Sequence, residues 1–178
     1  VDGRSAALDG VIESAKRLLA HKIEVKSLNV TVQGVDAPLN LWGDAQRLRQ
    51  IFVNLLSNAV KFTPEHGAIS VRVRHAIEGL VVSVTDSGPG IPAGQIDAVL
   101  SPFVRAAHAM ESAGAGAGLG LPIAKALVEA HGGSLSIESR AGEGATIRIV
   151  LPPARLEQAA AARPVPAPGA ALKARAAG

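Results

Sequence analysis

The sequence predicts an α/β (α+β) two-layer sandwich, in which a mixed five-stranded sheet carries three main helices on one face. Three observations predict it. Five stretches have the apolar pattern of strands, longer amphipathic stretches have the spacing of helices, and their order is not a regular strand–helix alternation. The predicted domain covers residues 1–153. The Ala/Pro-rich tail, residues 154–178, is predicted to be disordered.

The first half of the chain predicts a helix, a strand and a long helix. Residues 11–25 are predicted to be helical, with four side chains facing the core: Val11, Ile12, Leu18 and Leu19. Residues 26–33 alternate apolar and polar side chains, which predicts a half-buried strand. Residues 34–43 are predicted to be a loop. Asp44 is a good N-cap for the long helix, and Thr63-Pro64 ends it. Its predicted core side chains are Leu48, Ile51, Phe52, Leu55, Ala59 and Phe62.

The second half predicts the rest of the sheet. Further strands are predicted at 68–75, 80–86, 134–139 and 145–151. A short helix is predicted at 95–100 and a longer one at 119–131, which stops at His131-Gly132-Gly133. The stretch 104–118, which is rich in glycine and alanine, predicts a mobile segment.

The charge distribution argues against a nucleic-acid partner. The net charge of +3 comes from the tail, because residues 1–153 hold 14 basic and 14 acidic side chains. The chain has no cysteine, which excludes disulfides and a cysteine nucleophile. No apolar run approaches the roughly 20 residues of a membrane-spanning helix. We therefore expect a cytoplasmic domain without direct membrane contact. Because the chain begins with Val1, we expect it to be part of a longer protein, which allows a membrane anchor elsewhere.

A row of polar side chains lies on one face of the long helix: Gln50, Asn54, Asn58 and Lys61. Asparagine is a mediocre helix former, so two of them one turn apart suggest a function. An amide oxygen suits Mg²⁺ beside phosphates, and lysine supplies a point charge for phosphate. The alternative is a solvated polar face.

Two glycine-rich segments offer further sites. Asp86 ends a strand and is followed by Gly88 and Gly90, where a carboxylate could accept a hydrogen bond from an exocyclic amine of a flat ligand. The alternative is a turn with an aspartate cap. Residues 114–120 lead a glycine run into a helix, which suits phosphate. Neither a Walker A loop nor G-x-G-x-x-G occurs, and a flexible linker is the alternative. The five histidines show no metal-binding spacing.

Taken in order, these motifs resemble the ATP-binding catalytic domains of sensor histidine kinases, in the GHKL superfamily. The matching segments are Asn54–Thr63, Asp86–Pro92, Ser101–Arg105, Gly118–Lys125, His131-Gly-Gly and Gly142-Glu-Gly144. They correspond to the N, G1, F, G2 and G3 boxes of that family. The resemblance implies the Bergerat fold. The sequence of residues 119–133 is similar to the corresponding sequence of cell-cycle kinases of alphaproteobacteria.

The resemblance also implies roles for individual residues. Asn58 would coordinate Mg²⁺, Asn54 would support the phosphate side, and Asp86 would bind the adenine amino group. Gly88 and Gly90 would let the base approach. The implied lid residues are Phe103 and Arg105, with Arg105 near the phosphates. Gly116, Gly118 and Gly120 would wrap the phosphate tail, and Leu119 and Leu121 are further implied nucleotide-binding residues. The implied catalytic residues are Asn54, Lys61 and Arg105.

The implied reaction is transfer of the ATP γ-phosphoryl group to a histidine in a separate phosphoacceptor domain, with a response regulator as a further partner. None of the histidines here lies in an H-[ED]-x-x-x-P motif, so this chain alone is not expected to phosphorylate itself. Gyrase-type ATPases carry a glutamate where Asn54 stands, which disfavours the alternative of a GHKL ATPase.

Two departures motivate a further alternative, a weakened or pseudo-kinase scaffold. Ala117 replaces a threonine of the G2 box, and Ala145 replaces the hydroxyl residue that commonly follows the G3 box. Thr146 cannot substitute, because neighbouring strand residues point to opposite faces. Each lost hydrogen bond would cost about 1 kcal/mol of nucleotide binding, so binding should weaken rather than vanish.

Overall fold

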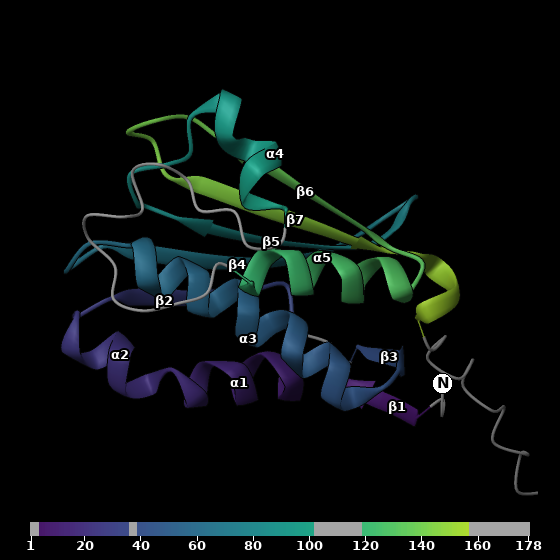
Figure 1. The fold of residues 1–178 in the computed structure, drawn as a ribbon. Helices are drawn as coiled ribbons and strands as arrows, with labels where there is room; N and C mark the ends of the chain where they lie inside the picture. Colours follow the sequence, from purple (N-terminus) through teal and green to yellow (C-terminus); the bar gives the residue numbers. More distant parts are fainter. Residues whose placement is uncertain (1–3, 36–38, 102–118, 157–178) are drawn as a thin grey trace, which may run out of the picture.

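A mixed sheet forms the centre of the protein (Figure 1). The computed structural model describes residues 4–35, 39–101 and 119–156. Its five-stranded sheet has the order β2-β4-β5-β7-β6. The strands are β2 (Asn29–Gln33), β4 (Ala68–Ala76), β5 (Gly79–Asp86), β6 (Ser134–Ser139) and β7 (Ala145–Leu151). Strand β2 pairs with β4 in parallel and the other pairs are antiparallel, so the predicted mixed sheet is confirmed.

Three main helices lie together on one side of this sheet (Figure 1): α1 (Leu8–Leu18), α3 (Ala45–Phe62) and α5 (Gly120–Ala130). Three shorter helical elements also occur: the α-helices α2 (Ala20–Val25) and α4 (Ile96–Val99), and the 3₁₀ turn η1 (Ala93–Gln95). Helix α3 packs between α1 and α5. None of the described helices combines the length and apolar character needed to span a bilayer.

The core lies between the sheet and the helices. Strand β4 alternates, and so does the end of β5, so that Ile69, Val71 and Val84 are buried beneath the helices while Arg72 and Thr85 face solvent on the outer side. From the helix side, α3 contributes fully buried residues such as Phe52 and the predicted leucines. Because side chains alternate along a strand, the helix-facing side chains of the sheet all lie on one of its two faces.

Three predictions about the helices are wrong. Residues 11–25 form α1 and α2 instead of one helix, with an interruption at Leu19 (φ −103°, ψ 0°). Leu18, predicted to face the core, is 67% exposed, because it lies beside the buried stripe that Leu8, Ile12, Ala15 and Leu19 form at helical spacing. Phe62 is half-buried, because it lies at the last position of α3, where the helix leaves the core.

A small second sheet was also not predicted. Strands β1 (Arg4–Ala7) and β3 (Asn40–Gly43) pair antiparallel, so part of the predicted 34–43 loop is a strand. Its partner lies far away in sequence, which no local pattern reveals. After β7, a 3₁₀ turn (Pro153–Arg155) follows, and Leu156 forms an isolated bridge to Leu41. These residues lie beyond the predicted boundary at 153. The tail from 157 onward is outside the described residues.

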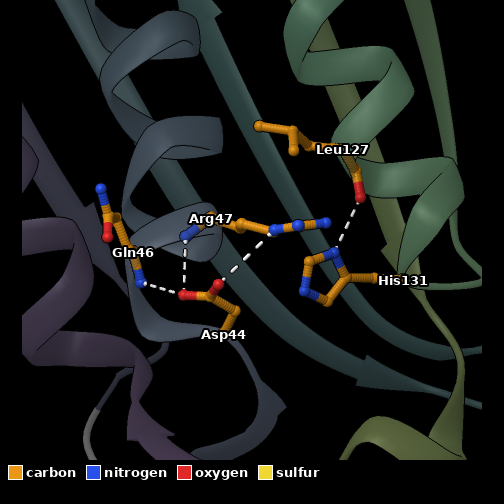
Figure 2. A network of polar contacts seen from close by, with 5 residues as sticks. All are labelled: Asp44, Gln46, Arg47, Leu127 and His131. Carbon is orange, nitrogen blue, oxygen red and sulfur yellow. Dashed lines mark hydrogen bonds and ion pairs between the residues drawn. The ribbon is translucent and has the colours of Figure 1, made fainter. Parts of the chain in front are cut away.

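The start of α3 meets the end of α5 (Figure 2). Asp44 caps α3 as predicted, and its Oδ1 accepts hydrogen bonds from the backbone N–H groups of Gln46 (2.8 Å) and Arg47 (3.3 Å). His131 ends α5 and is only 3% exposed, with its Nδ1 lying 2.7 Å from the Leu127 carbonyl oxygen. The predicted glycine stop is confirmed by the left-handed backbone that follows at Gly132 (φ +77°).

Candidate functional site

The polar row of α3 borders the start of α5. The Nε2 atom of Gln50 donates a 3.0 Å hydrogen bond to Oδ1 of Asn54, which confirms that these side chains share one helix face. Asn54 and Asn58 are half-buried. The Asn54 Nδ2 is buried and has no hydrogen-bond partner among the residues that the structure describes. A buried amide donor without a partner is costly, so this atom is available to a ligand.

Lys61 lies at the exposed end of the same row. Its Nζ sits 5.1 Å from the centroid of the Phe62 ring, a cation–π contact. The side chain is solvent-exposed. The helix therefore presents three amides and one ammonium group along a single face, which includes the residues that the sequence predicts to contact metal and phosphate.

Asp86 lies at the end of β5, on the helix-facing side of the sheet. It is only 6% exposed, and its Oδ1 accepts a 2.8 Å hydrogen bond from the Gly88 backbone N–H. Burial raises the pKa of Asp86 above the ordinary aspartate value of 3.8, while the backbone N–H groups of Gly88 and Ala145 act in the opposite direction. The carboxyl group of Asp86 is therefore desolvated and contacted by backbone N–H groups. Such a group is suited to accept one hydrogen bond from an amine.

The loop after Asp86 packs directly against the β6–β7 turn. The Gly142 N–H donates to the Pro89 carbonyl (2.7 Å), and Gly90 has φ +70°. A Cβ on Gly90 would collide with the carbonyl oxygen of Arg140. A Cβ on Gly88 would lie 2.9 Å from the carbonyl oxygen of Phe62, at the end of α3. Both glycines are thus required by the packing of the protein itself, and their contact with a base stays a prediction.

The remaining predicted residues lie around the start of α5. Leu119 precedes the helix, Leu121 is buried in the core, and Gly120 lies close to α3, where an added Cβ would be 3.9 Å from the Asn54 carbonyl oxygen. The structure therefore brings the helix start and the α3 polar row together. Four predicted residues lie outside the described part of the chain: Phe103, Arg105, Gly116 and Gly118.

An open cavity of about 530 Å³ lies beside the G3 segment. Residues from α4, β6, β7 and the intervening turn line it, among them Ile96, Ser139 and Ala145. Across the described residues, no three His, Cys, Asp or Glu side chains gather as a metal-binding cluster. A metal in this site would therefore depend on amide and phosphate oxygens.

Two residues of this region were missed by sequence reasoning. Ser139 accepts a hydrogen bond from the Ile91 N–H (2.8 Å) and donates one to the Gly144 carbonyl (2.6 Å). A signal existed, because Ser139 is polar at the inward phase set by Leu135 and Ile137. Lys26, whose ammonium contacts the end of α3, gave no local signal.

Residue 145, where the sequence departs from the family pattern, lies next to Asp86 as predicted. Ala145 pairs with Asp86 across the strands, so both lie on the helix-facing side. The hydroxyl of Thr146 lies 3.0 Å from that of Thr85 on the outer face, which confirms that Thr146 cannot replace it.

Comparison with known proteins agrees with this geometry. Residues 43–155 match the family described as histidine kinase-, DNA gyrase B- and HSP90-like ATPase. The histidine protein kinase DivJ of Caulobacter vibrioides is 38% identical over 158 residues, which covers 87% of this chain and 26% of DivJ. The chain spans between 15% and 39% of the length of the curated relatives compared. The narrower resemblance to cell-cycle kinases stays a prediction.

Two solved structures share the fold. The catalytic domain of histidine kinase ThkA is 26% identical with a TM-score of 0.72, covering 85% of this chain and 97% of that one. ThkA has also been solved in complex with the response regulator protein TrrA. Full-length ShkA in complex with AMPPNP is 28% identical with a TM-score of 0.76, covering 90% of this chain and 32% of ShkA. The chain therefore belongs to the histidine kinase-, DNA gyrase B- and HSP90-like ATPase family, as an ATP-binding catalytic domain of the sensor histidine kinase type.

Proposed function

We propose that this domain binds ATP with Mg²⁺ and transfers the γ-phosphoryl group to a histidine of a phosphoacceptor domain. The observation that carries the proposal is the unpartnered, buried Nδ2 of Asn54. The backbone of Asn54 lies beside the start of α5, and its side chain shares one helix face with Asn58. A buried donor next to a helix N-terminus suits an anionic phosphate. The desolvated Asp86 carboxyl, at the end of the neighbouring strand, suits the adenine amino group.

The residues present fit Mg²⁺ as well as the nucleotide. The Asn58 amide oxygen is a hard ligand that Mg²⁺ accepts together with phosphate oxygens. When bound, Mg²⁺ neutralises charge on the phosphates. The domain's own side chains hold and orient the phosphates: Asn54 by its free amide donor, Lys61 by its charge. We further propose that Arg105 approaches the phosphates.

The partners of the whole protein follow from its relatives. A histidine-bearing phosphoacceptor domain, in the same chain or in the second subunit of a dimer, would receive the phosphoryl group. A response regulator would take it next, as the pairing of ThkA with TrrA suggests. This phosphoryl transfer would take place in the cytoplasm.

One experiment tests the phosphotransfer. The chain is fused to its native phosphoacceptor region and incubated with labelled ATP and Mg²⁺, and acid-labile phosphohistidine is measured. We expect Asn58→Ala to abolish transfer and Ser57→Ala, one residue away and off the polar row, to retain it. Full activity of Asn58→Ala would overturn the metal assignment, and Asp86→Asn should weaken nucleotide binding.

A second candidate, a nucleotide-binding scaffold with weak catalysis, is favoured by one observation. Ala145 offers no hydroxyl beside Asp86. Absence of acid-labile phosphate at saturating ATP, with nucleotide still bound, would favour this scaffold. Steady phosphate release without phosphohistidine would favour a GHKL ATPase, although Asn54 lacks the carboxylate that a hydrolytic base requires.

A further inference from the structure

Ser139 lies in the same cross-strand row as Asp86. The strand register pairs Asp86 of β5 with Ala145 of β7, and Ala145 with Ser139 of β6. All three side chains therefore lie on the helix-facing side of the sheet. This row holds the carboxyl group at one end and a hydroxyl group at the other, with the methyl group of Ala145 between them.

The hydroxyl of Ser139 makes two hydrogen bonds whose directions are fixed. The Ile91 backbone N–H can only donate, so the Ser139 oxygen accepts there, at 2.8 Å. The single hydroxyl proton then goes to the Gly144 carbonyl oxygen, at 2.6 Å. Ser139 thereby ties the loop after Asp86 to the β6–β7 turn, next to the Gly142 to Pro89 bond that joins the same two segments.

The Gly144 carbonyl and the Ala145 N–H belong to one peptide group. The Ala145 N–H stabilises the ionised form of the Asp86 carboxyl, against the effect of burial on its pKa. A hydrogen bond to the carbonyl of a peptide polarises that peptide and strengthens its N–H as a donor. The strand pairing places this same peptide group opposite Asp86, so one peptide group separates the Ser139 hydroxyl from Asp86.

We propose that Ser139 is a positioning residue for nucleotide binding, which orders the Gly144–Ala145 peptide and the Ile91 backbone so that Asp86 meets the adenine in a fixed geometry. This inference rests on the proposed function of Asp86. It also gives a role to the hydroxyl group of Ser139, which lies in the same cross-strand row as Ala145, a residue without a hydroxyl group. Thr146 is not available for this task, because its hydroxyl pairs with Thr85 on the outer face.

The test measures the dissociation constant of AMPPNP for the 178-residue chain and its variants by calorimetry. Ser139→Ala removes both hydrogen bonds, and we expect the dissociation constant to rise about three- to tenfold. Ser139→Cys keeps the volume but weakens both bonds, so it is the second variant should Ser139→Ala not fold. Ser139→Thr keeps the hydroxyl and has room beside the 530 Å³ cavity, so we expect it to restore binding.

A second readout separates positioning from mere stability. Each variant is measured well below its own unfolding temperature, and the Asp86 carboxyl is titrated by NMR. We expect Ser139→Ala to raise the pKa of Asp86, because the Ala145 N–H becomes a weaker donor. The matched control is Ser136→Ala, on the same strand but exposed on the outer face, which should change neither quantity.

The outcomes distinguish this inference from the function on which it rests. If Asp86→Asn weakens binding while Ser139→Ala leaves both the dissociation constant and the Asp86 pKa unchanged, the role of Ser139 is refuted and the proposed function stands. If Asp86→Asn itself leaves nucleotide binding unchanged, the assignment of Asp86 fails, and the role of Ser139 fails with it.

Discussion

The two ends of α3 are both capped, but by different means. At the N-terminus, Asp44 caps the helix from the adjacent position in the sequence. At the C-terminus, the ammonium group of Lys26 donates to the carbonyl oxygens of Val60 (2.9 Å), Lys61 (3.0 Å) and Thr63. These acceptors lie 34 to 37 residues further along the chain. One end is thus fixed locally and the other by the tertiary fold.

The difference matters because the C-terminal end borders the candidate site. Asn58 and Lys61 lie in the last turns of α3, and Gly88 packs against the Phe62 carbonyl. A lysine at this position has three donors for the free carbonyl groups and a charge that complements the helix dipole. Lys26, between α2 and β2, therefore supports the end of α3 where we propose that phosphate binds, whereas Asp44 supports only the fold.

The largest expected effect comes from removing the C-terminal cap. Lys26→Met leaves several partly buried carbonyl groups without their charged donor, and we expect the free energy of unfolding to fall by about 2 kcal/mol. Nucleotide affinity should fall too, because the last turn of α3 loosens. Urea denaturation and calorimetry measure the two effects. Lys22→Met, on exposed α2, is the control, and equal behaviour of the two variants would refute the role of Lys26.

Removing the N-terminal cap should have a smaller and purely structural effect. Asp44→Ala loses the hydrogen bonds to Gln46 and Arg47, and we expect a loss of about 1 kcal/mol in the free energy of unfolding. Asp44→Asn should retain most of it. Nucleotide affinity should stay constant, since this end of α3 faces His131 and not the site (Figure 2). A weakened affinity would break the contrast between the two ends.

Placing a hydroxyl group at residue 145 should strengthen nucleotide binding. Ala145→Ser adds a hydroxyl in the row between Asp86 and Ser139, and we expect AMPPNP to bind about fivefold more tightly, equivalent to about 1 kcal/mol. Ala141→Ser, in the exposed β6–β7 turn, is the matched control. Unchanged binding by Ala145→Ser would mean that this hydroxyl is not what limits affinity.

The smallest effect near neutral pH concerns Asp86. Burial raises its pKa above 3.8, so protonation removes its charge and hydrogen-bonding capacity at a higher pH than for an ordinary aspartate. Nucleotide affinity should fall as the pH falls through this raised pKa. Calorimetry across the acid range checks it, and the same decline in Asp86→Asn would contradict the assignment.

The linked effect on stability has the opposite direction. Because the folded state binds this proton more readily than the unfolded chain, the contribution of Asp86 to stability is fully present below the unfolded pKa. It is lost as the pH rises through the folded pKa. Comparing wild type with Asp86→Asn by denaturation isolates this contribution.

Local patterns predicted the local features of the fold. The Asp44 cap, the Thr63-Pro64 stop, the glycine stop after His131 and the positions of the five predicted strands all depend on neighbouring residues, and the structure confirms them. The outward orientation of Thr146 followed from strand alternation alone.

Features that depend on distant partners could not be predicted in this way. The predicted inward orientation of Leu18 was wrong because Leu18 lies beside the buried stripe of α1, and no breaker residue marks the interruption between α1 and α2. The β1–β3 sheet, the Lys26 cap and the links of Ser139 each join segments that are remote in sequence. For the site, the sequence placed Asn54, Asn58 and Asp86 in the correct elements, but it could not show which of their atoms are already engaged.

The sheet order has a consequence for how the domain can vary in length. Two antiparallel hairpins, β4–β5 and β6–β7, lie side by side and meet only through the pairing of β5 with β7. Each hairpin closes over a few residues, whereas the connection between them runs from residue 87 to residue 133. The entropy of closing a flexible connection rises by only about 0.6 kcal/mol for each doubling of its length. Because α4 and α5 lie within this connection and α5 packs against α3, we expect changes of length to be tolerated only between these two helices.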